Sequence, residues 1–562
     1  MQDADSIIIG SGMGGLSTAL SLARAGQRVL VFEQHYVPGG WAHSFLRKGY
    51  KFSPGVHFVG HLQEGGNARK VYEGLGIAND MVFFRQNPQG YDYNIVGDHH
   101  FRMPAGIDNL QEALSQQYPK SARGIRRYLT FSQQVFDELM RCTEPFRSVK
   151  DILLLPWRTR HIGRMGWWKL RTVLDFYLRD PYVKTHLSLQ CGNYGLPPQM
   201  TPFVVHAVVS NHCMAGTYYP RGSGAGIVKA FTKNIKKLGG EIRTSAGVKK
   251  IILEDTTRGK QAVGVELENG ETFYAKNIIS NADPHKTYLD MVGKEYLSKS
   301  LVKKLGGTKY SIAALNLFLV VEKDLRQLGM DSGNMWYSSI PNLDHVYDRF
   351  MQKDLLTDPE FPALFITSPT LKDPVSYDGK YHAMEIIAFV NYESFKQYEH
   401  LKYGERSDAY ESFKRKLEDK LLHTMERVLP GIKESVRLIE LGTPVTANHY
   451  INTTQGNVYG PAKLFSQVGP FNYRHRSEID GLFLCGAATL AHGITGATNS
   501  GIGAAATVLG CKKAELLQFD EGQNLRIYEA EDDSQWPDWL KVKREVKQKR
   551  VKTLRREQIL HR

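Results

Sequence analysis

The sequence has few cysteines and no apolar run long enough to cross a membrane. An odd, dispersed set without a C-x-x-C pair argues against a disulfide framework or a metal site, and is typical of a reducing compartment. The longest apolar stretch, at 310–322, is broken by Asn316 and predicts a core strand rather than a membrane span. The five cysteines stand at positions 142, 191, 213, 485 and 511 of 562.

A recognisable targeting segment is also missing. Residues 1–9 are acidic at first and then enter an apolar strand at once. A signal peptide would begin with positive charge and continue into a longer apolar region. We therefore expect no signal peptide, no transit peptide and no transmembrane helix.

Positive charge is in excess and is concentrated at the C-terminus. The formal net charge is +14, and residues 541–562 hold ten Lys or Arg against two Glu. This segment fits either a solvated tail without a specific partner or a basic amphipathic helix on anionic lipid. Because aromatic residues are not interleaved with its cations, we do not expect a nucleic acid partner.

A glycine pattern lies close to the N-terminus. The stretch IIIGSGMGG at 7–15 has the spacing G-x-G-x-x-G, and an amphipathic helix and the strand RVLVFE, ending at Glu33, follow it. Strand, helix, strand and acid together are typical of a β-α-β dinucleotide-binding unit. The glycines admit the pyrophosphate, the helix N-terminus attracts it, and the acid accepts hydrogen bonds from a ribose diol.

Two later segments show the strand and helix patterns of the same kind of α/β domain. Residues 220–300 contain a helix and strands, with a hairpin turn predicted at Asn269-Gly270, and residues 436–510 again show strand, glycine-rich loop and helix. We predict an α/β fold in which a Rossmann-type domain is assembled from discontinuous segments and carries an inserted α+β substrate domain.

A second glycine-rich loop occurs at 221–226, with the sequence RGSGAG. It follows TYYP instead of an apolar strand, so the context that a dinucleotide fingerprint requires is absent. We interpret it as a loop near the ligand, without a separate NAD site.

Longer motifs resemble the flavin-dependent polyene oxidoreductases, which comprise bacterial phytoene desaturases, carotenoid cis-trans isomerases and retinol saturases. The resemblance runs in order through most of residues 5–510, and the GVHFVG and TPVT motifs are most similar to the retinol saturase and carotenoid isomerase branch. The motifs that carry it lie at 32–60, 180–198, 218–231, 278–293, 442–450 and 481–505.

The resemblance implies FAD as the cofactor. Glu33 would hold the adenosine ribose, His43 would lie near the pyrophosphate or flavin, and Val248 would meet the adenine through its backbone. Many flavoproteins have Gly-Asp where this chain has Gly486-Ala487, which weakens that single contact. The implied cofactor-binding residues are Gly10, Gly12, Gly14, Gly15, Glu33, Gln34, Gly39, Gly40, His43, Val248, Gly486 and Ala487.

Domain boundaries follow from the same reading. The charged C-terminal extension covers 511–562, and the inserted domain is expected to face the substrate and the membrane. The FAD-binding domain is predicted at 1–115, 216–300 and 436–510, and the substrate domain at 116–215 and 301–435.

The implied reaction acts on a carbon–carbon double bond of a conjugated polyene lipid, by saturation, desaturation or isomerisation. Hydride addition to an alkene needs a proton, and His57 is the candidate donor; its alternative role is a hydrogen-bonded histidine in the pocket wall. His492 is a second candidate, and Tyr450 is expected only to line the pocket. The electron partner stays open.

Two other functions remain as alternatives. An amine oxidase-like flavoprotein would act on a polar substrate and would need an aromatic cage beside the flavin. A catalytically idle flavoprotein would bind pigment at a membrane and leave the redox state of the flavin unchanged.

A hydrophobic polyene substrate predicts that the protein contacts a bilayer. Residues 146–178 interleave cations with Trp157, Trp167 and Trp168, a mixture typical of interfacial helices. The alternative is an ordinary helical cap over a substrate tunnel. We expect a peripheral membrane protein on the cytoplasmic side.

Overall fold

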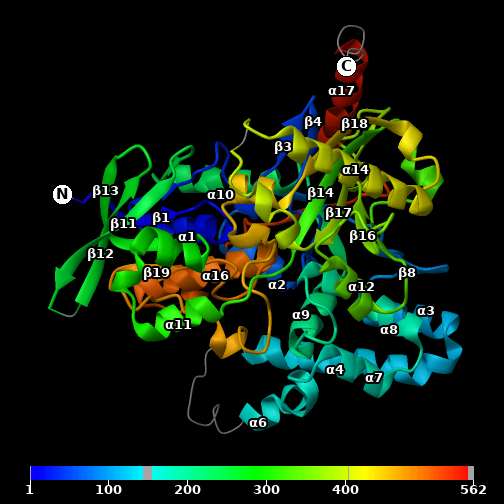
Figure 1. Ribbon diagram of the computed structural model, residues 1–562, viewed down its shortest axis with the longest axis horizontal. Coiled ribbons are helices and arrows are strands. Elements are labelled where there is room, and N and C mark those ends of the chain that lie inside the picture. Colours follow the sequence, from blue (N-terminus) through cyan, green and yellow to red (C-terminus); the bar gives the residue numbers. More distant parts are fainter. Residues whose placement is uncertain (1, 143–154, 258, 403, 555–562) are drawn as a thin grey trace.

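The first sheet of the computed structural model collects strands from distant parts of the chain (Figure 1). The structure describes residues 2–142, 155–257, 259–402 and 404–554. β1 lies between β2 and β13, β10 and β19 extend this parallel set, and β12 and β11 continue it as antiparallel strands. The strands are β1 (Ala4–Ile9), β2 (Val29–Phe32), β10 (Glu241–Arg243), β11 (Val248–Thr256), β12 (Gly259–Leu267), β13 (Thr272–Ser280) and β19 (Leu482–Leu484).

This parallel sheet confirms the predicted Rossmann-type α/β fold. β1 is buried along nearly its whole length, which explains its continuous apolar sequence. The turn at Asn269-Gly270 joins β12 to β13, with Gly270 at a positive φ of 87° as the predicted hairpin requires. The helices α1 (Met13–Arg24), α10 (Gly224–Lys237) and α16 (Gly493–Leu509) pack together in one apolar core with this sheet.

A second, mixed sheet carries the wall of the candidate substrate pocket. The apolar stretch predicted as a core strand forms its buried β14, which confirms that prediction. The domain boundaries stay a prediction, but β7 and β8 from the N-terminal part and β18 from the C-terminal part pair within this sheet. In spatial order its strands are β18 (Val436–Gly442), β14 (Ala313–Val321), β17 (His382–Val390), β16 (Ala363–Thr367), β15 (Asn334–Ser338), β7 (Asp92–Val96) and β8 (His99–Met103).

A helical layer covers the second sheet and lies at the lower right of Figure 1. Side chains of its helices other than α6 share an apolar core with α12 (Leu343–Phe350) and with residues of β15, β16 and β17. The layer consists of α3 (Ile107–Gln117), α4 (Ala122–Cys142), α6 (Leu155–Arg158), α7 (Leu170–Tyr177), α8 (Pro181–Ser188) and α9 (Phe203–Met214).

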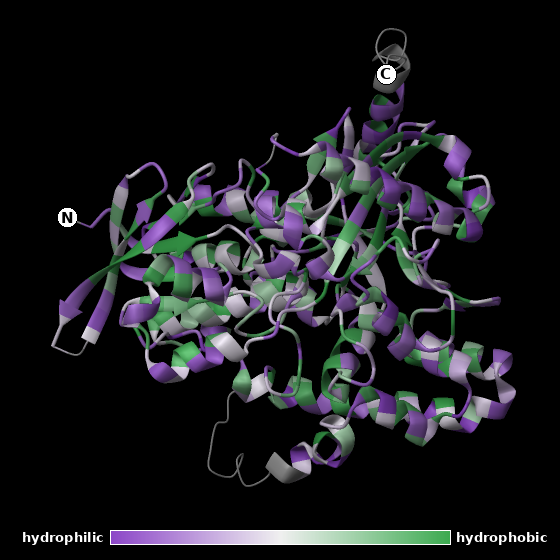
Figure 2. Ribbon diagram, in the orientation of Figure 1, coloured by the Kyte–Doolittle hydropathy of each residue, from purple (hydrophilic) through white to green (hydrophobic). Residues whose placement is uncertain are grey.

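The described part of the C-terminal extension is an integral piece of the fold. β20 (Arg526–Glu529) adds in parallel to β6 (Val82–Arg85), whose other neighbour is β9 (Thr217–Pro220). The basic helix α17 (Asp538–Leu554) follows, and Trp536 and Leu540 anchor its start in a small core. Figure 2 shows how hydrophilic the rest of α17 is. Among the described helices none combines the length and the apolar character that a membrane span requires.

Candidate active site

The loops predicted to hold FAD converge at the ends of β1, β2 and β19. A Cβ added at Gly14 would lie 2.8 Å from the Cα of Gly486, and one at Gly40 would lie 3.1 Å from the Cα of Gly12. A Cβ at Gly15 would lie 2.0 Å from the carbonyl oxygen of Gly10, so only glycine permits this turn from strand to helix. Three loops from separate parts of the sequence thus form one glycine-walled cradle.

Glu33 organises the end of this cradle that is predicted to hold the adenosine. Its carboxylate accepts hydrogen bonds from the backbone N–H and the hydroxyl of Ser11, at 2.8 and 2.6 Å, and from the backbone N–H of His35 at 2.9 Å. The N–H of Gly39 donates to the Ser11 hydroxyl, which ties the loop at 39–40 to the first glycine turn. The residues just before Val248 pair with the end of β2, because Ala246 N–H donates to the carbonyl of Glu33. Gln34, another residue predicted to bind the cofactor, directly follows Glu33 in the sequence.

His43 is buried beside this cradle as a neutral imidazole. Burial, together with the nearby His35, lowers its pKa to about 4. Its Nδ1 lies 2.7 Å from the carbonyl oxygen of Gly40, so Nδ1 carries the proton and Nε2 is an acceptor. An acceptor fits a hydroxyl or N–H of the cofactor better than a pyrophosphate oxygen. Of the two positions predicted for His43, near the pyrophosphate or near the flavin, the second therefore fits better.

The N-terminus of α16 has polar atoms that fit the polar edge of a flavin. His492 Nδ1, Thr495 Oγ1 and Thr498 Oγ1 are buried and have no hydrogen-bond partner among the described residues. The first-turn N–H groups of this helix add a positive dipole end. Lys463, also buried, donates to the carbonyl oxygen of Ala487 at 2.8 Å, and burial lowers its pKa to about 8. The residues present thus fit FAD along the whole cradle.

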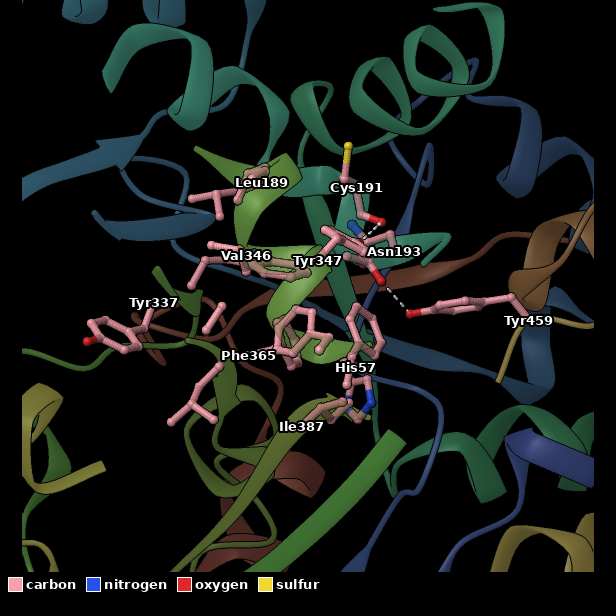
Figure 3. Close-up of a pocket in the computed structure, with 17 residues that line it drawn as sticks. His57, Leu189, Cys191, Asn193, Tyr337, Val346, Tyr347, Phe365, Ile387 and Tyr459 are labelled. Carbon is pink, nitrogen blue, oxygen red and sulfur yellow. Dashed lines mark hydrogen bonds between the residues drawn. The ribbon is translucent and has the colours of Figure 1, made fainter. Parts of the chain in front are cut away.

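An apolar pocket (Figure 3) lies next to the start of α16, because the ring of its lining residue Tyr459 packs against His492. Its free volume is about 60 Å³, so a long ligand must displace ring side chains on entry. The hydroxyls of Tyr347 and Tyr459 donate to the carbonyl oxygens of Cys191 and Gly192, at 3.1 and 2.6 Å. Its walls also include Leu189, Asn193, Trp336, Val346, Phe350, Phe365, Ile387 and Phe389.

His57, the predicted proton donor, lines this pocket and is held by a carboxylate. Its Nδ1 lies 3.0 Å from Glu385 Oε2, and the two side chains are 13% and 2% exposed. The other carboxylate oxygen accepts the backbone N–H of Ser53 at 2.6 Å. A carboxylate acceptor at Nδ1 fixes the tautomer and the ring orientation. Nε2 makes no hydrogen bond with a described residue, which leaves it available to a substrate.

A buried polar chain supports the two polar edges of the pocket. The Lys372 ammonium donates to the carbonyl oxygen of His57 at 2.7 Å and to the amide oxygen of Asn334. Asn334 donates in turn to Asp92 at 2.9 Å, and Gln190 links Asp92 to Asn193. Burial lowers the pKa of Lys372 to about 7 and raises that of Asp92 to about 7.

His492 joins the pocket to the flavin cradle. Its Nε2 donates to the carbonyl oxygen of Asn193 at 2.8 Å, and its ring packs against Tyr459 with centroids 4.9 Å apart. Burial lowers the pKa of His492 to about 3, so it acts as a neutral donor behind the lining residues Asn193 and Tyr459. Tyr450 packs instead against His35 and is not among the residues that line the pocket.

Sequence reasoning found His57 but missed Glu385, Lys372 and Asp92. The one signal in the sequence is a lone acid in the apolar strand HAMEIIAFV. The loop at 221–226, interpreted as lying near the ligand, lines none of this pocket and opens on a different cleft.

Two curated relatives match the chain over most of its length. It is 26% identical to an all-trans-retinol 13,14-reductase of Danio rerio, over 90% of this chain and 86% of the relative. It is 27% identical to the chloroplastic prolycopene isomerase 2 of an Oncidium hybrid cultivar, over 86% and 80%. Both belong to the branch that the motifs indicated, which confirms the resemblance.

Solved structures confirm the fold. Cyclohexylamine oxidase from Brevibacterium oxydans superposes with a TM-score of 0.57 at 15% identity, covering 92% of this chain and 99% of its own. The model of the flavin-containing amine oxidoreductase family matches residues 13–304, more than half of the chain. The chain therefore belongs to the flavin-containing amine oxidoreductase family and is an FAD-dependent oxidoreductase or isomerase.

Proposed function

We propose that the enzyme acts on a carbon–carbon double bond of a conjugated polyene lipid. One observation carries this proposal: the pocket beside the cradle is walled mainly by aliphatic and aromatic side chains, and His57, which Glu385 holds from outside the lining, stands at its edge. A polyene offers no polar group for binding, so apolar contact must position it. The relatives named for a retinol and for a prolycopene reaction support the same substrate class.

We propose that the double bond is saturated rather than formed. When bound, FAD supplies hydride-transfer chemistry. Saturation of a double bond also consumes a proton at the second carbon, and His57 Nε2 is the group that we propose to deliver it. Glu385 positions the imidazole and balances the positive charge that it carries before transfer.

The amine oxidase alternative fits this pocket less well. The aromatic side chains that it needs are present, but no Asp or Glu is among the described residues that line the pocket. An ammonium substrate buried among these rings would have no carboxylate partner, which is costly in a site of low polarity.

The test is the mass of the product. The FAD-loaded enzyme, chemically reduced and kept free of oxygen, is incubated with all-trans-retinol and with a poly-cis carotenoid. We expect a product heavier by two hydrogens. His57→Asn should lower its rate of formation by about 100-fold, the usual contribution of a general acid, and Glu385→Gln by less.

A matched control is Tyr347→Phe, because this hydroxyl faces the Cys191 carbonyl and the ring is kept. It should retain most of the activity, and all three variants should keep their flavin absorbance. An unchanged mass with a new retention time would show an isomerase. If neither polyene is converted while cyclohexylamine reduces the oxidised flavin, the amine oxidase function replaces the proposal. If neither the polyenes nor cyclohexylamine change the redox state of the flavin, the result supports the idle pigment carrier.

We also propose that the helical layer touches a membrane, as a lipid substrate requires. Trp157, Trp167 and Trp168 are exposed there, among cations that include Arg160 and Arg164. The first part of the predicted interfacial stretch, 146–154, lies outside the described residues. Rings at the headgroup level with neighbouring cations are typical of peripheral attachment.

A further inference from the structure

A second cleft opens between β4 (Tyr50–Phe52), β6, α10 and α17. Its volume is about 640 Å³, within the range of small-molecule sites. None of the residues predicted to hold FAD lines it, and none of the pocket residues in Figure 3 does. The cleft is therefore separate from the candidate active site.

Cations from five parts of the chain line this cleft. Lys233 is paired with Asp80 at 2.5 Å, and Arg526 donates to the carbonyl oxygen of Asn79 at 2.7 Å. The other cations make no ion pair with a described carboxylate. The full set of lining cations is Lys51, Arg221, Lys229, Lys233, Arg526 and Lys543.

These cations repel one another. Arg221 is the largest cause of the lowered pKa of Lys543, with Lys229 and Arg526 adding to it. Burial lowers the pKa of Lys51, and Lys229 and Arg221 lower it further, against the opposing effect of Asp373. A ligand that binds several of these cations would relieve this repulsion, whereas a neutral ligand would not.

The arrangement is held by packing rather than left on a loose tail. The Trp539 ring lies under three of the cations, with Arg221, Arg526 and Lys543 between 5.1 and 5.6 Å from its centroid. The next residue, Leu540, is fully buried and secures the start of α17. The charged groups are therefore brought together before any ligand arrives.

The glycine-rich loop at 221–226 supplies the floor of the cleft. Gly222, Ala225 and Gly226 line it, at the positive N-terminal end of the 14-residue helix α10. Asp373, the second acid of the cleft, accepts the Gly222 N–H at 2.8 Å and so holds the loop in place. Small residues here let a bulky anion approach the helix end.

We propose that this cleft binds a ligand that carries at least two closely spaced phosphate groups, free in solution or on a lipid headgroup. Clustered cations at a helix N-terminus match clustered phosphate oxygens in charge and in hydrogen bonding. The proposal goes beyond the polyene reaction and does not depend on it, since the two sites share no residue.

The experiment measures inorganic pyrophosphate binding to the FAD-loaded protein by calorimetry, so that the dinucleotide cradle is already filled. We expect Lys229→Glu/Lys543→Glu to weaken binding by at least about tenfold, because two exposed cations become anions. Lys250→Glu, on the exposed face of β11, is the control and should bind as the wild type does. Flavin absorbance reports that each variant is folded.

A second arm identifies the source of the phosphates. Co-sedimentation is compared for phosphatidylcholine vesicles with and without phosphatidylinositol bisphosphate. Recruitment by the phosphoinositide that the double variant loses assigns the cleft to a lipid headgroup; pyrophosphate binding without such recruitment assigns it to a soluble ligand. The proposal is overturned if the wild type binds neither probe, or if the double variant binds both as the wild type does.

Discussion

Lys372 is a buried cation whose hydrogen-bond partners are neutral. Its ammonium donates to a backbone carbonyl and to an amide oxygen, and it makes no ion pair with a described carboxylate. Burial without a direct counter-charge explains why its pKa falls to about 7. This group sits behind His57 and holds the backbone of the residue that we propose to deliver the proton.

The lowered pKa makes stability depend on pH. Between about pH 7 and pH 10, the unfolded lysine binds a proton that the folded one has lost, so the free energy of unfolding rises with pH in this window. We expect Lys372→Met to reduce this slope by up to about 1.4 kcal/mol per pH unit, the value for one proton. Urea denaturation of the FAD-loaded protein at several pH values measures it.

The matched control is Lys250→Met, in which an exposed lysine is removed. Its slope should equal that of the wild type. Equal slopes for the wild type and Lys372→Met would show that Lys372 titrates normally in the folded protein.

At this scale the motifs predicted that the glycine loops meet, but they gave no sign of the supports of the pocket. His57 stands in a motif, whereas Glu385 lies 328 residues away in the sequence. Lys372 and Asp92 come from separate elements and meet only through Asn334. A pair formed by tertiary packing leaves no spacing pattern in either segment, so local periodicity cannot reveal it.

At the scale of elements, α1 and α16 approach until their backbones touch. A Cβ added at Gly501 would lie 2.0 Å from Ser17 Oγ and 2.2 Å from the carbonyl oxygen of Gly14. The hydroxyls of Ser17 and Thr18 cross this contact to carbonyl oxygens of α16, both at 3.0 Å. The close approach brings both helix N-termini to the cofactor cradle.

Gly501→Ala should therefore push the two helices apart. We expect it to lower the free energy of unfolding by about 1–3 kcal/mol, as overpacking of a tight core does, and to weaken FAD retention. Gly306→Ala makes the same exchange in α11 (Lys299–Gly307), where nothing lies within 4 Å of the added carbon, and should be neutral or slightly stabilising. Denaturation and flavin release measure both; similar values for the two variants would contradict the close-contact argument.

Local patterns predicted the strand–helix–strand units, because each is formed by residues close in sequence. Sheet partners were harder to predict. β7 pairs in parallel with β15, whose first residue, Asn334, aligns with Asp92. Neither strand carries a signal for a partner so far along the chain, so the strand content of the second sheet could be predicted but its order could not.

At the scale of the whole molecule, the two positively charged surfaces lie at opposite ends. Figure 1 shows α6 at the bottom and α17 at the top, beside β3 (Phe45–Arg47) and β4. A flat bilayer that touches the helical layer cannot also reach the cleft of α17. The sequence allowed a membrane contact for both basic segments, because it contains no information about their separation.

The helical layer is the end that should bind a bilayer, because it exposes the rings of Trp157, Trp167, Trp168 and Phe176, at 75%, 42%, 45% and 51% exposure. Burying about half of one indole contributes roughly 2 kcal/mol, so Trp157→Glu/Trp168→Glu should weaken vesicle binding by more than about tenfold. Co-sedimentation with phosphatidylcholine vesicles that contain phosphatidylserine measures this. Leu46→Glu removes an exposed apolar side chain at the other end, on β3, and should leave binding unchanged. If Leu46→Glu loses more vesicle binding than the tryptophan variant does, the α17 end and not the helical layer binds the membrane.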